Sequence, residues 1–330
     1  MDHLQSSAMF LDLIYTLVGF ALLIWGADRF SAGAGAIARL MGVSPVVIGL
    51  TVVAFATSAP EIMVSISAAR EGLTGMAVGN ALGSNIANIG LVLAISALLK
   101  PVGHDVSATL RSELPLLLGV SLGTGVLLLD NELNLSDGII LLVGLTVFLY
   151  WVTRTGQRVR RGDPVIAEAT LELPPTMPAF KASGMLLIGF AALLIGAELL
   201  VTGAESIARA FGVSDLIIGL TVVAVGTSLP ELAVTLVSAM RGEAGLAVGN
   251  VIGSNVFNLL AVIGAAGIVG PGPLDASVIS LHYPVMLLFT AALLRLTYNP
   301  FGSPGFGRVM GLTLLAGFVA YQGYLLSTAL

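Results

Sequence analysis

The amino-acid sequence predicts an all-α membrane protein of ten transmembrane helices, arranged as two inverted-topology repeats of five helices each. Composition, the spacing of apolar segments and an internal repeat predict this fold. Of the 330 residues, 56% are hydrophobic and only 10% are charged, whereas soluble domains carry about 25% charged residues. The mean hydropathy is +1.00. Such a chain cannot cover a surface that faces water, so its solvent must be lipid.

Ten apolar segments follow one another along the chain, and a helix needs about 20 such residues to cross the hydrocarbon core of a bilayer. They lie at residues 9–38, 44–70, 74–99, 107–129, 136–153, 182–208, 214–240, 245–270, 276–298 and 306–328. The first segment is too long for the apolar region of a signal peptide, and no Lys or Arg precedes it. We therefore expect it to be retained as a helix.

One long polar stretch, residues 154–181, separates a first five-helix repeat (1–153) from a second (182–330). It contains four prolines and several acids, and we interpret the acids as part of a solvated linker, not as a regulatory calcium site: Asp163, Glu168 and Glu172. Its first residues include four arginines, and Lys and Arg are enriched in cytoplasmic loops. We therefore predict a cytoplasmic linker, which places both the N-terminus and the C-terminus outside.

The other loops can be compared with this orientation. It places five basic residues on the cytoplasmic side: Lys100, Arg111, Arg241, Arg295 and Arg308. The loops 130–137 and 270–275, predicted outside, contain no Lys or Arg, while Arg70 and Arg209 are exceptions. The balance favours placing both termini outside, and we expect this multi-pass protein to lie in a prokaryotic inner membrane.

An internal repeat relates the two halves. Residues 42–61 read GVSPVVIGLTVVAFATSAPE and residues 212–231 read GVSDLIIGLTVVAVGTSLPE, identical at 14 of 20 positions with an offset of 170. The match resumes in GNALGSNIAN (79–88) and GNVIGSNVFN (249–258). Because each half has an odd number of segments, the second must enter the membrane in the opposite sense. Inverted repeats are typical of transporters, whose binding site lies near the midplane where the repeats meet.

Each repeat carries one glutamate near the middle of an apolar segment, Glu61 and Glu231. A charge at the bilayer centre costs at least about 2.5–3.5 kcal/mol, so two matched charges need compensation. A carboxylic acid kept protonated, or a structural ion pair, is the alternative to an ion site. No Lys or Arg lies where it could pair with both glutamates.

A proline precedes each glutamate. Proline lacks an N–H, so the carbonyl four residues earlier loses its helical partner. Pro60 frees the carbonyl of Ala56, and Pro230 frees that of Gly226. Freed carbonyls need partners in lipid, so the pattern predicts a broken helix that offers backbone and side-chain oxygens together.

The GNxxGSNxxN segments are predicted to form the other side of the site. Polar residues spaced by four share one helical face: Asn80, Ser84 and Asn88 in the first segment, and Asn250, Ser254 and Asn258 in the second. These side chains could instead join helices, at about 0.6 kcal/mol per bond. That alternative is strongest for the amides of Asn80, Asn85, Asn250 and Asn255.

The predicted site offers only oxygen ligands, which select hard cations, and flexible carboxylates and carbonyls suit calcium better than magnesium. The chain has no cysteine and shows no nucleophile–base constellation, so we expect no enzyme activity. We expect no cofactor besides the transported ions and no nucleic-acid partner. Three histidines lie near predicted segment ends, and we expect no zinc site from them: His3, His104 and His282.

At these residues the chain resembles the calcium/cation antiporter superfamily, and within it the prokaryotic sodium/calcium exchangers. Residues 49–88 and 219–258 resemble the alpha-1 and alpha-2 regions of that family. The resemblance implies exchange of cytosolic calcium for external sodium by alternating access. It implies the following ion ligands: the carboxylates of Glu61 and Glu231; Thr57, Ser58, Ser84, Thr227, Ser228 and Ser254; the backbone carbonyls of Ala54 and Ala224; and Asn88 and Asn258.

One position departs from some relatives, which carry Asp where this chain has Asn258. The fixed charge of the site is then at most −2, so one calcium ion would give a neutral site and three sodium ions would give +1. The missing acid also argues against potassium co-transport, because this position is acidic in the potassium-dependent branch.

Two other functions remain open at this point. A calcium/proton antiporter could carry its protons on Glu61 and Glu231, and a passive cation channel would need no alternating access. Asp28 and Glu198 are repeat partners; they either line an ion path or, as we favour, cap a water-facing stretch. We expect the chain to function as a monomer.

Overall fold

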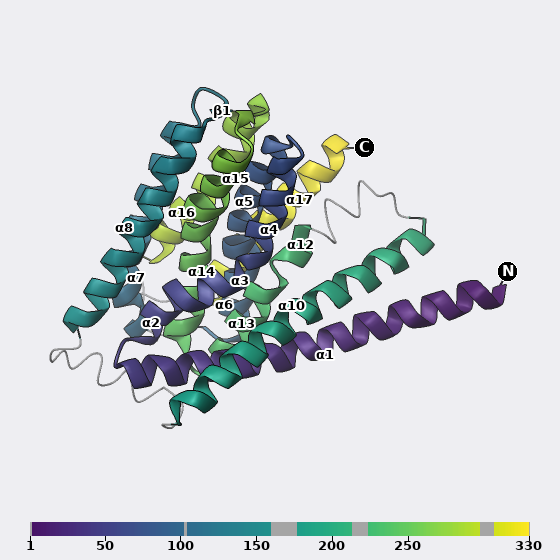
Figure 1. Ribbon diagram of the computed structural model, residues 1–330, viewed down its shortest axis with the longest axis horizontal. Coiled ribbons are helices and arrows are strands. Elements are labelled where there is room, and N and C mark those ends of the chain that lie inside the picture. Colours follow the sequence, from purple (N-terminus) through teal and green to yellow (C-terminus); the bar gives the residue numbers. More distant parts are fainter. Residues whose placement is uncertain (1, 102–103, 160–176, 213–223, 298–306, 330) are drawn as a thin grey trace.

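The computed structural model describes residues 2–101, 104–159, 177–212, 224–297 and 307–329, and these residues are almost entirely helical (Figure 1). Short π-helical turns, labelled η, interrupt several of the helices. The elements of the first half are α1 (Asp2–Met41), α2 (Pro45–Ile48), η1 (Gly49–Val53), α3 (Ala54–Thr57), α4 (Ala59–Arg70), α5 (Thr74–Ala87), η2 (Asn88–Leu93), α6 (Ala94–Leu99), α7 (His104–Leu127), β1 (Glu132–Leu133) and α8 (Leu135–Val159).

The second half repeats this pattern of helices. Its elements are α10 (Ala179–Ala210), α12 (Ala224–Thr227), α13 (Leu229–Met240), α14 (Ala244–Phe257), η4 (Asn258–Val262), α15 (Ile263–Val269), β2 (Gly272–Pro273), η5 (Val278–His282), α16 (Tyr283–Thr297) and α17 (Arg308–Ala329). Most of the predicted linker (160–176) and part of the second repeated motif (213–223) lie outside the described residues. So do the side chains of His3 and His104.

The described helices are long and apolar enough for a multi-pass membrane protein. Seven of them could each cross a bilayer, or eight if the bent pair Pro45–Thr57 and Ala59–Arg70 is one span. Two shorter apolar helices, Glu113–Leu127 and Leu229–Met240, accompany them. Large hydrophobic side chains are exposed along the outer helices, for example Phe20, Phe55 and Leu288. The chain is therefore an integral membrane protein that crosses the bilayer several times.

Helices α1 and α10 form a long antiparallel pair along one side of the molecule (Figure 1). Glycines spaced seven residues apart line their contact: Gly19, Gly26 and Gly33 in α1, and Gly189, Gly196 and Gly203 in α10. A Cβ atom on Gly196 would lie 2.7 Å from the Leu23 backbone nitrogen. The two backbones therefore touch directly, as small residues allow in membranes.

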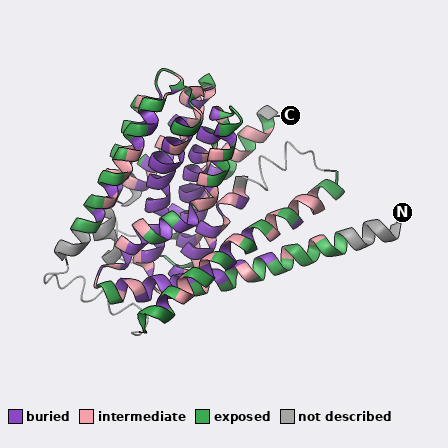
Figure 2. Ribbon diagram, in the orientation of Figure 1, coloured by how far each residue is buried: buried purple, intermediate pink, exposed green. Residues whose placement is uncertain are grey.

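The two most buried spans lie at the centre of the remaining helices (Figure 2). They are residues 74–99 (α5, η2 and α6) and 244–269 (α14, η4 and α15). Every residue from Leu246 to Phe257 is buried. These spans carry the GNxxGSNxxN segments, so the asparagines and serines of these segments are buried inside the protein, except Asn80, which is half-buried.

Contacts between loops show which ends of the helices lie together. Strand β1 pairs antiparallel with β2, with Glu132 opposite Pro273, so the loops 130–137 and 270–275 meet at one end. At the other end of the span 74–99, the Lys100 Nζ donates to the Met240 carbonyl over 3.3 Å. The Arg308 Nε donates to the Leu98 carbonyl, also over 3.3 Å. The loops 130–137 and 270–275, which contain no Lys or Arg, therefore lie at one end of the helices. Lys100 and Arg308 lie at the opposite end.

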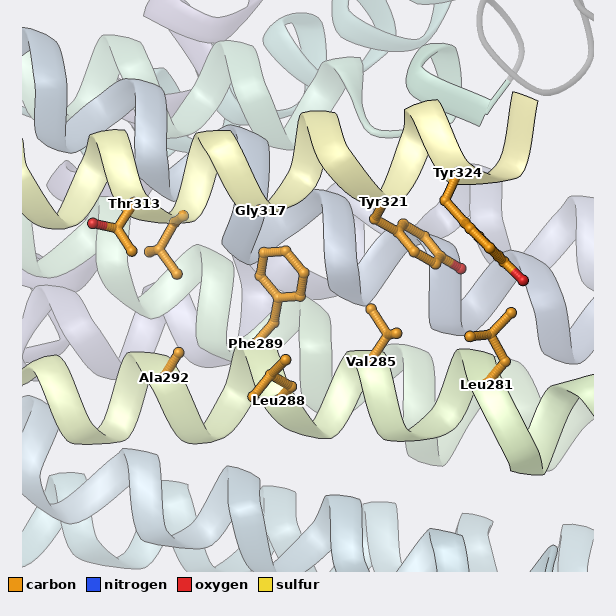
Figure 3. A pocket seen from close by; sticks show the side chains of 10 residues that line it. Leu281, Val285, Leu288, Phe289, Ala292, Thr313, Gly317, Tyr321 and Tyr324 are labelled. Atoms are coloured by element: carbon orange, nitrogen blue, oxygen red, sulfur yellow. The ribbon is translucent and has the colours of Figure 1, made fainter. Parts of the chain in front are cut away.

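A cavity of about 460 Å³ lies between α16 and α17 (Figure 3). Its lining is almost wholly apolar and includes Leu281, Val285, Phe289 and Leu314. Tyr321 borders it, but its hydroxyl contacts the His282 Nδ1 at 2.8 Å. A cation would lose its hydration there without gaining ligands, so this cavity is unsuited to binding one.

Candidate ion-binding site

The predicted helix breaks are present in both halves. Ser58 (φ −83°, ψ 7°) separates α3 from α4, and the helical stretch Pro45–Thr57 is bent by 45° from Ala59–Arg70. Ser228 (φ −89°, ψ 6°) likewise separates α12 from α13. The break lies two residues before the proline. Pro60 and Pro230 therefore lie in the first turn of the next helix. Backbone N–H groups in a first turn have no partner within the helix, so the missing N–H of proline costs no hydrogen bond there.

The break places each glutamate at a helix N-terminus. Glu61 lies in the first turn of α4 and Glu231 in the first turn of α13, and both are fully buried. The N-terminal turn of a helix carries unpaired N–H groups and a partial positive charge, which stabilise a carboxylate. Each half therefore holds one acid inside the bilayer in the same local setting.

The two halves contact each other at these residues. The Ser58 Oγ donates to the Glu231 Oε1 over 3.1 Å. The Thr57 Oγ1 lies 3.0 Å from the Asn250 Oδ1 and 3.3 Å from the Ser254 Oγ. The side chains of Glu61 and Glu231 lie near each other, and both are buried. The structure therefore brings predicted site residues of both halves together in one place.

Several oxygen atoms of this cluster have no hydrogen-bond partner among the described residues. They are both carboxylate oxygens of Glu61, the Glu231 Oε2 and the Ser228 Oγ. Ser84 lies next to the Glu61 carboxylate, but no bond between them meets hydrogen-bond geometry. Buried polar atoms in native proteins are nearly always paired. A cation that has shed its hydration shell needs oxygen ligands of this kind.

Asn80 anchors the helix that carries Glu61. Its Nδ2 donates to the Glu61 backbone carbonyl over 3.2 Å and to the Ser65 Oγ over 3.0 Å. These bonds join α5 to the first turns of α4. The Asn80 amide thus joins two helices, which is the alternative role that the sequence analysis gave for this residue. It also holds the backbone of Glu61 in place.

The second half repeats this arrangement. The Asn250 Nδ2 lies 3.5 Å from the Glu231 backbone carbonyl and 3.0 Å from the Thr235 Oγ1. Sequence reasoning overlooked Ser65 and Thr235, which follow the glutamates by one helical turn. The repeat could have identified them, since Ser65 and Thr235 are both small hydroxyl residues and are separated by the repeat offset of 170.

Asn88 and Asn258 begin the π turns η2 and η4, and both are fully buried. Neither polar atom of the Asn88 amide has a partner in the described part of the chain. The Asn258 Nδ2 donates to the Asn85 Oδ1 over 3.1 Å, while its Oδ1 is unpaired among the described residues. The π turns were not predicted; such turns are frequent at functional sites because they shift side chains out of helical register.

The predicted carbonyl ligands are described only in the first half. The Ala54 carbonyl accepts from the Ser58 N–H over 3.0 Å and from the Thr57 Oγ1 over 3.4 Å. Ala224 is the first residue of α12, but its surroundings lie outside the described part. Thr227 ends the same helix and is partly buried.

The remaining polar candidates lie elsewhere. Asp28 is 46% exposed and pairs with Arg241 over 2.8 Å, and Glu198 is exposed. The described residues contain no group of three or more His, Asp and Glu that could hold a metal. The buried acids of this cluster, within the described part of the chain, are Glu61 and Glu231.

Comparison with known proteins shows the family of the chain. A family described as "Sodium/calcium exchanger protein" matches residues 11–154 and 181–326. CaxA of Alkalimonas amylolytica is 47% identical over 97% of this chain and 100% of its own. The sodium/calcium exchanger MaX1 of Methanosarcina acetivorans is 31% identical over 94% of this chain and 97% of its own.

One solved structure is similar to this chain over nearly its whole length. The sodium-calcium exchanger NCX_Mj soaked with zero Na⁺ and Ca²⁺ superimposes with a TM-score of 0.82 at 33% identity. The superposition covers 96% of this chain and 99% of that one. With the paired halves, the buried acids and these matches, the chain belongs to the sodium/calcium exchanger protein family.

Proposed function

We propose that the chain is a secondary active antiporter that exchanges calcium for sodium by alternating access and exports calcium. The observation that carries the proposal is the pair Glu61 and Glu231: two fully buried acids with three unpaired carboxylate oxygens in the described structure. Membership of the exchanger family supports it, because the relatives named as exchangers share nearly the whole length of the chain.

Ion binding is assigned to residues of both halves. Two carboxylates neutralise one Ca²⁺, and hydroxyl, amide and carbonyl oxygens complete the six to eight ligands that this ion takes. Sodium binds at the same cluster in exchange. The proposed ligands are Glu61, Glu231, Thr57, Thr227, Ser58, Ser228, Ser84, Ser254, Asn88, Asn258 and the carbonyls of Ala54 and Ala224. The cross-half bond from Ser58 to Glu231 supports a single shared site.

The proposed architecture is ten spans in two inverted repeats, joined by a cytoplasmic linker, with both termini outside. The equivalent breaks at Ser58 and Ser228 and the matching bonds of Asn80 and Asn250 support the repeat. Because all the proposed ligands belong to one chain, the proposed functional unit is a monomer.

Calcium uptake into proteoliposomes tests the proposal. Sodium, potassium and proton gradients are imposed one at a time, with the membrane potential clamped. We expect an outward sodium gradient to drive calcium uptake, and neither of the other gradients to replace it.

Each competing function has its own outcome. Uptake driven by a proton gradient alone would establish calcium/proton exchange and overturn the sodium coupling. Unitary currents in a planar bilayer, with calcium flux that no counter-ion gradient accelerates, would instead establish a passive channel.

A further inference from the structure

Asn85 and Asn255 occupy equivalent positions in the two halves. In the described structure, only the Asn85 side chain of this pair forms hydrogen bonds. The Asn85 Nδ2 donates to the Asn255 backbone carbonyl over 3.3 Å, and its Oδ1 accepts from the Asn258 Nδ2 over 3.1 Å. The Asn255 side chain has no partner for either polar atom among the described residues. All three amides are buried.

The chemistry of these groups fixes the direction of both amides. A backbone carbonyl can only accept, so the Asn85 amide must present its Nδ2 to the Asn255 carbonyl. Its Oδ1 is then turned toward Asn258. Because that oxygen also only accepts, Asn258 must present its own Nδ2 and turn its Oδ1 away.

The spacing of Asn258 from Ser254 places it on the helical face that carries the proposed ion site. Asn258 follows Ser254 by one helical turn and shares its face, and the Ser254 Oγ lies 3.3 Å from the Thr57 Oγ1. The Asn258 Oδ1 is buried without a partner in the described structure. An amide oxygen held in this way is a neutral, hard ligand that needs no reorientation when a cation arrives.

We propose that Asn85 is a positioning residue that holds the Asn258 amide with its oxygen available to the transported ion. The inference rests on the proposed function, since it assumes that Asn258 contacts the ion. The equivalent pair in the other half, Asn88 and Asn255, has no such bond among the described residues. Only the second-half amide is therefore held in advance.

The test compares calcium transport by purified Asn85→Ala, Asn258→Ala and double-variant proteins, with Asn255→Ala as the matched control. Removing a group that orients a metal ligand typically weakens affinity about 10–100-fold. We expect Asn85→Ala to raise the half-saturating calcium concentration by about that factor, and Asn255→Ala to leave it near the wild-type value. Asn85→Leu fills the volume left by alanine and is expected to behave as Asn85→Ala does.

The double variant separates positioning from a general structural role. If Asn85 acts through Asn258, the double variant will be no weaker than Asn258→Ala alone, because contacting residues are not additive. Fully additive effects, or Asn85 variants that match the Asn255→Ala control, would overturn the inference. A wild-type protein without sodium-driven calcium transport would instead overturn the proposed function.

Discussion

Glu61 and Glu231 lie at the ends of short helices with no basic residue in the described structure to neutralise them. Replacing either by Gln leaves a divalent ion with one charge unbalanced. A net charge in the membrane interior costs at least about 2.5–3.5 kcal/mol, or roughly a hundredfold in affinity. We expect Glu61→Gln and Glu231→Gln each to reduce calcium transport in proteoliposomes to background.

Glu71 offers a matched control for this experiment. It caps the C-terminal end of α4, the same helix that begins with Glu61, but its side chain is exposed. Glu71→Gln should transport calcium at the wild-type rate. Near-normal transport by either buried-acid variant would remove that glutamate from the proposed site.

The sequence identified residues that lie together in the buried polar cluster, but it did not predict which of them form hydrogen bonds with one another. The duplicated motif identified the two acids, and the cost of placing a charge inside the membrane gave the reason they matter. The repeat could not reveal that Ser58 bonds to Glu231 while the equivalent Ser228 Oγ is unpaired in the described structure. An internal repeat shows which residues of the two halves are equivalent. It does not show how the two halves differ in structure, and so it does not show which equivalent residues form bonds.

At the scale of elements, the contact between α1 and α10 depends on glycine. A Cβ atom on Gly196 would lie 2.7 Å from the Leu23 nitrogen and 2.9 Å from the Gly19 carbonyl oxygen, whereas one on Gly184 meets nothing within 4 Å. Overpacking typically costs about 1–3 kcal/mol. Gly196→Ala should therefore lower the melting temperature of the detergent-purified protein, and Gly184→Ala on the same helix should not. Equal melting temperatures would refute the close contact.

A group of charged residues ties α1 to the turn between α13 and α14. Arg241 bonds to Asp28 over 2.8 Å and to Glu243 over 3.0 Å. Burial raises the pKa of Glu243 above its ordinary value of 4.5, although the Arg241 guanidinium partly opposes this shift. The folded protein thus holds the Glu243 proton more tightly than the unfolded chain does.

The sign of the pH dependence follows from this shift. Because the folded pKa of Glu243 is the higher one, unfolding releases a proton in this range, and stability falls as pH rises from 4.5 through the folded pKa. We expect Glu243→Gln to remove that part of the decline when melting temperature is measured against pH. Parallel curves for the wild type and the variant would show that Glu243 does not contribute.

The sequence predicted most elements of the fold. Helices occupy the predicted apolar segments wherever the chain is described, since hydrophobic length alone requires them. The breaks before Pro60 and Pro230 were predicted from the missing N–H groups. The π turns at Asn88 and Asn258 were not, because a π turn needs only one extra residue per turn and leaves no mark in composition.

At the scale of the whole molecule, the orientation in the membrane can be tested by chemical labelling. The chain has no cysteine, so each introduced thiol reports on one position. Asp130 lies in the loop that pairs with 270–275, and Lys100 bonds to Met240 at the opposite end; both are exposed. With the termini outside, a membrane-impermeant maleimide should label Asp130→Cys in intact spheroplasts and Lys100→Cys only after the membrane is opened. The reverse pattern would invert the proposed topology, and labelling of both in intact spheroplasts would contradict the placement of these loops on opposite sides.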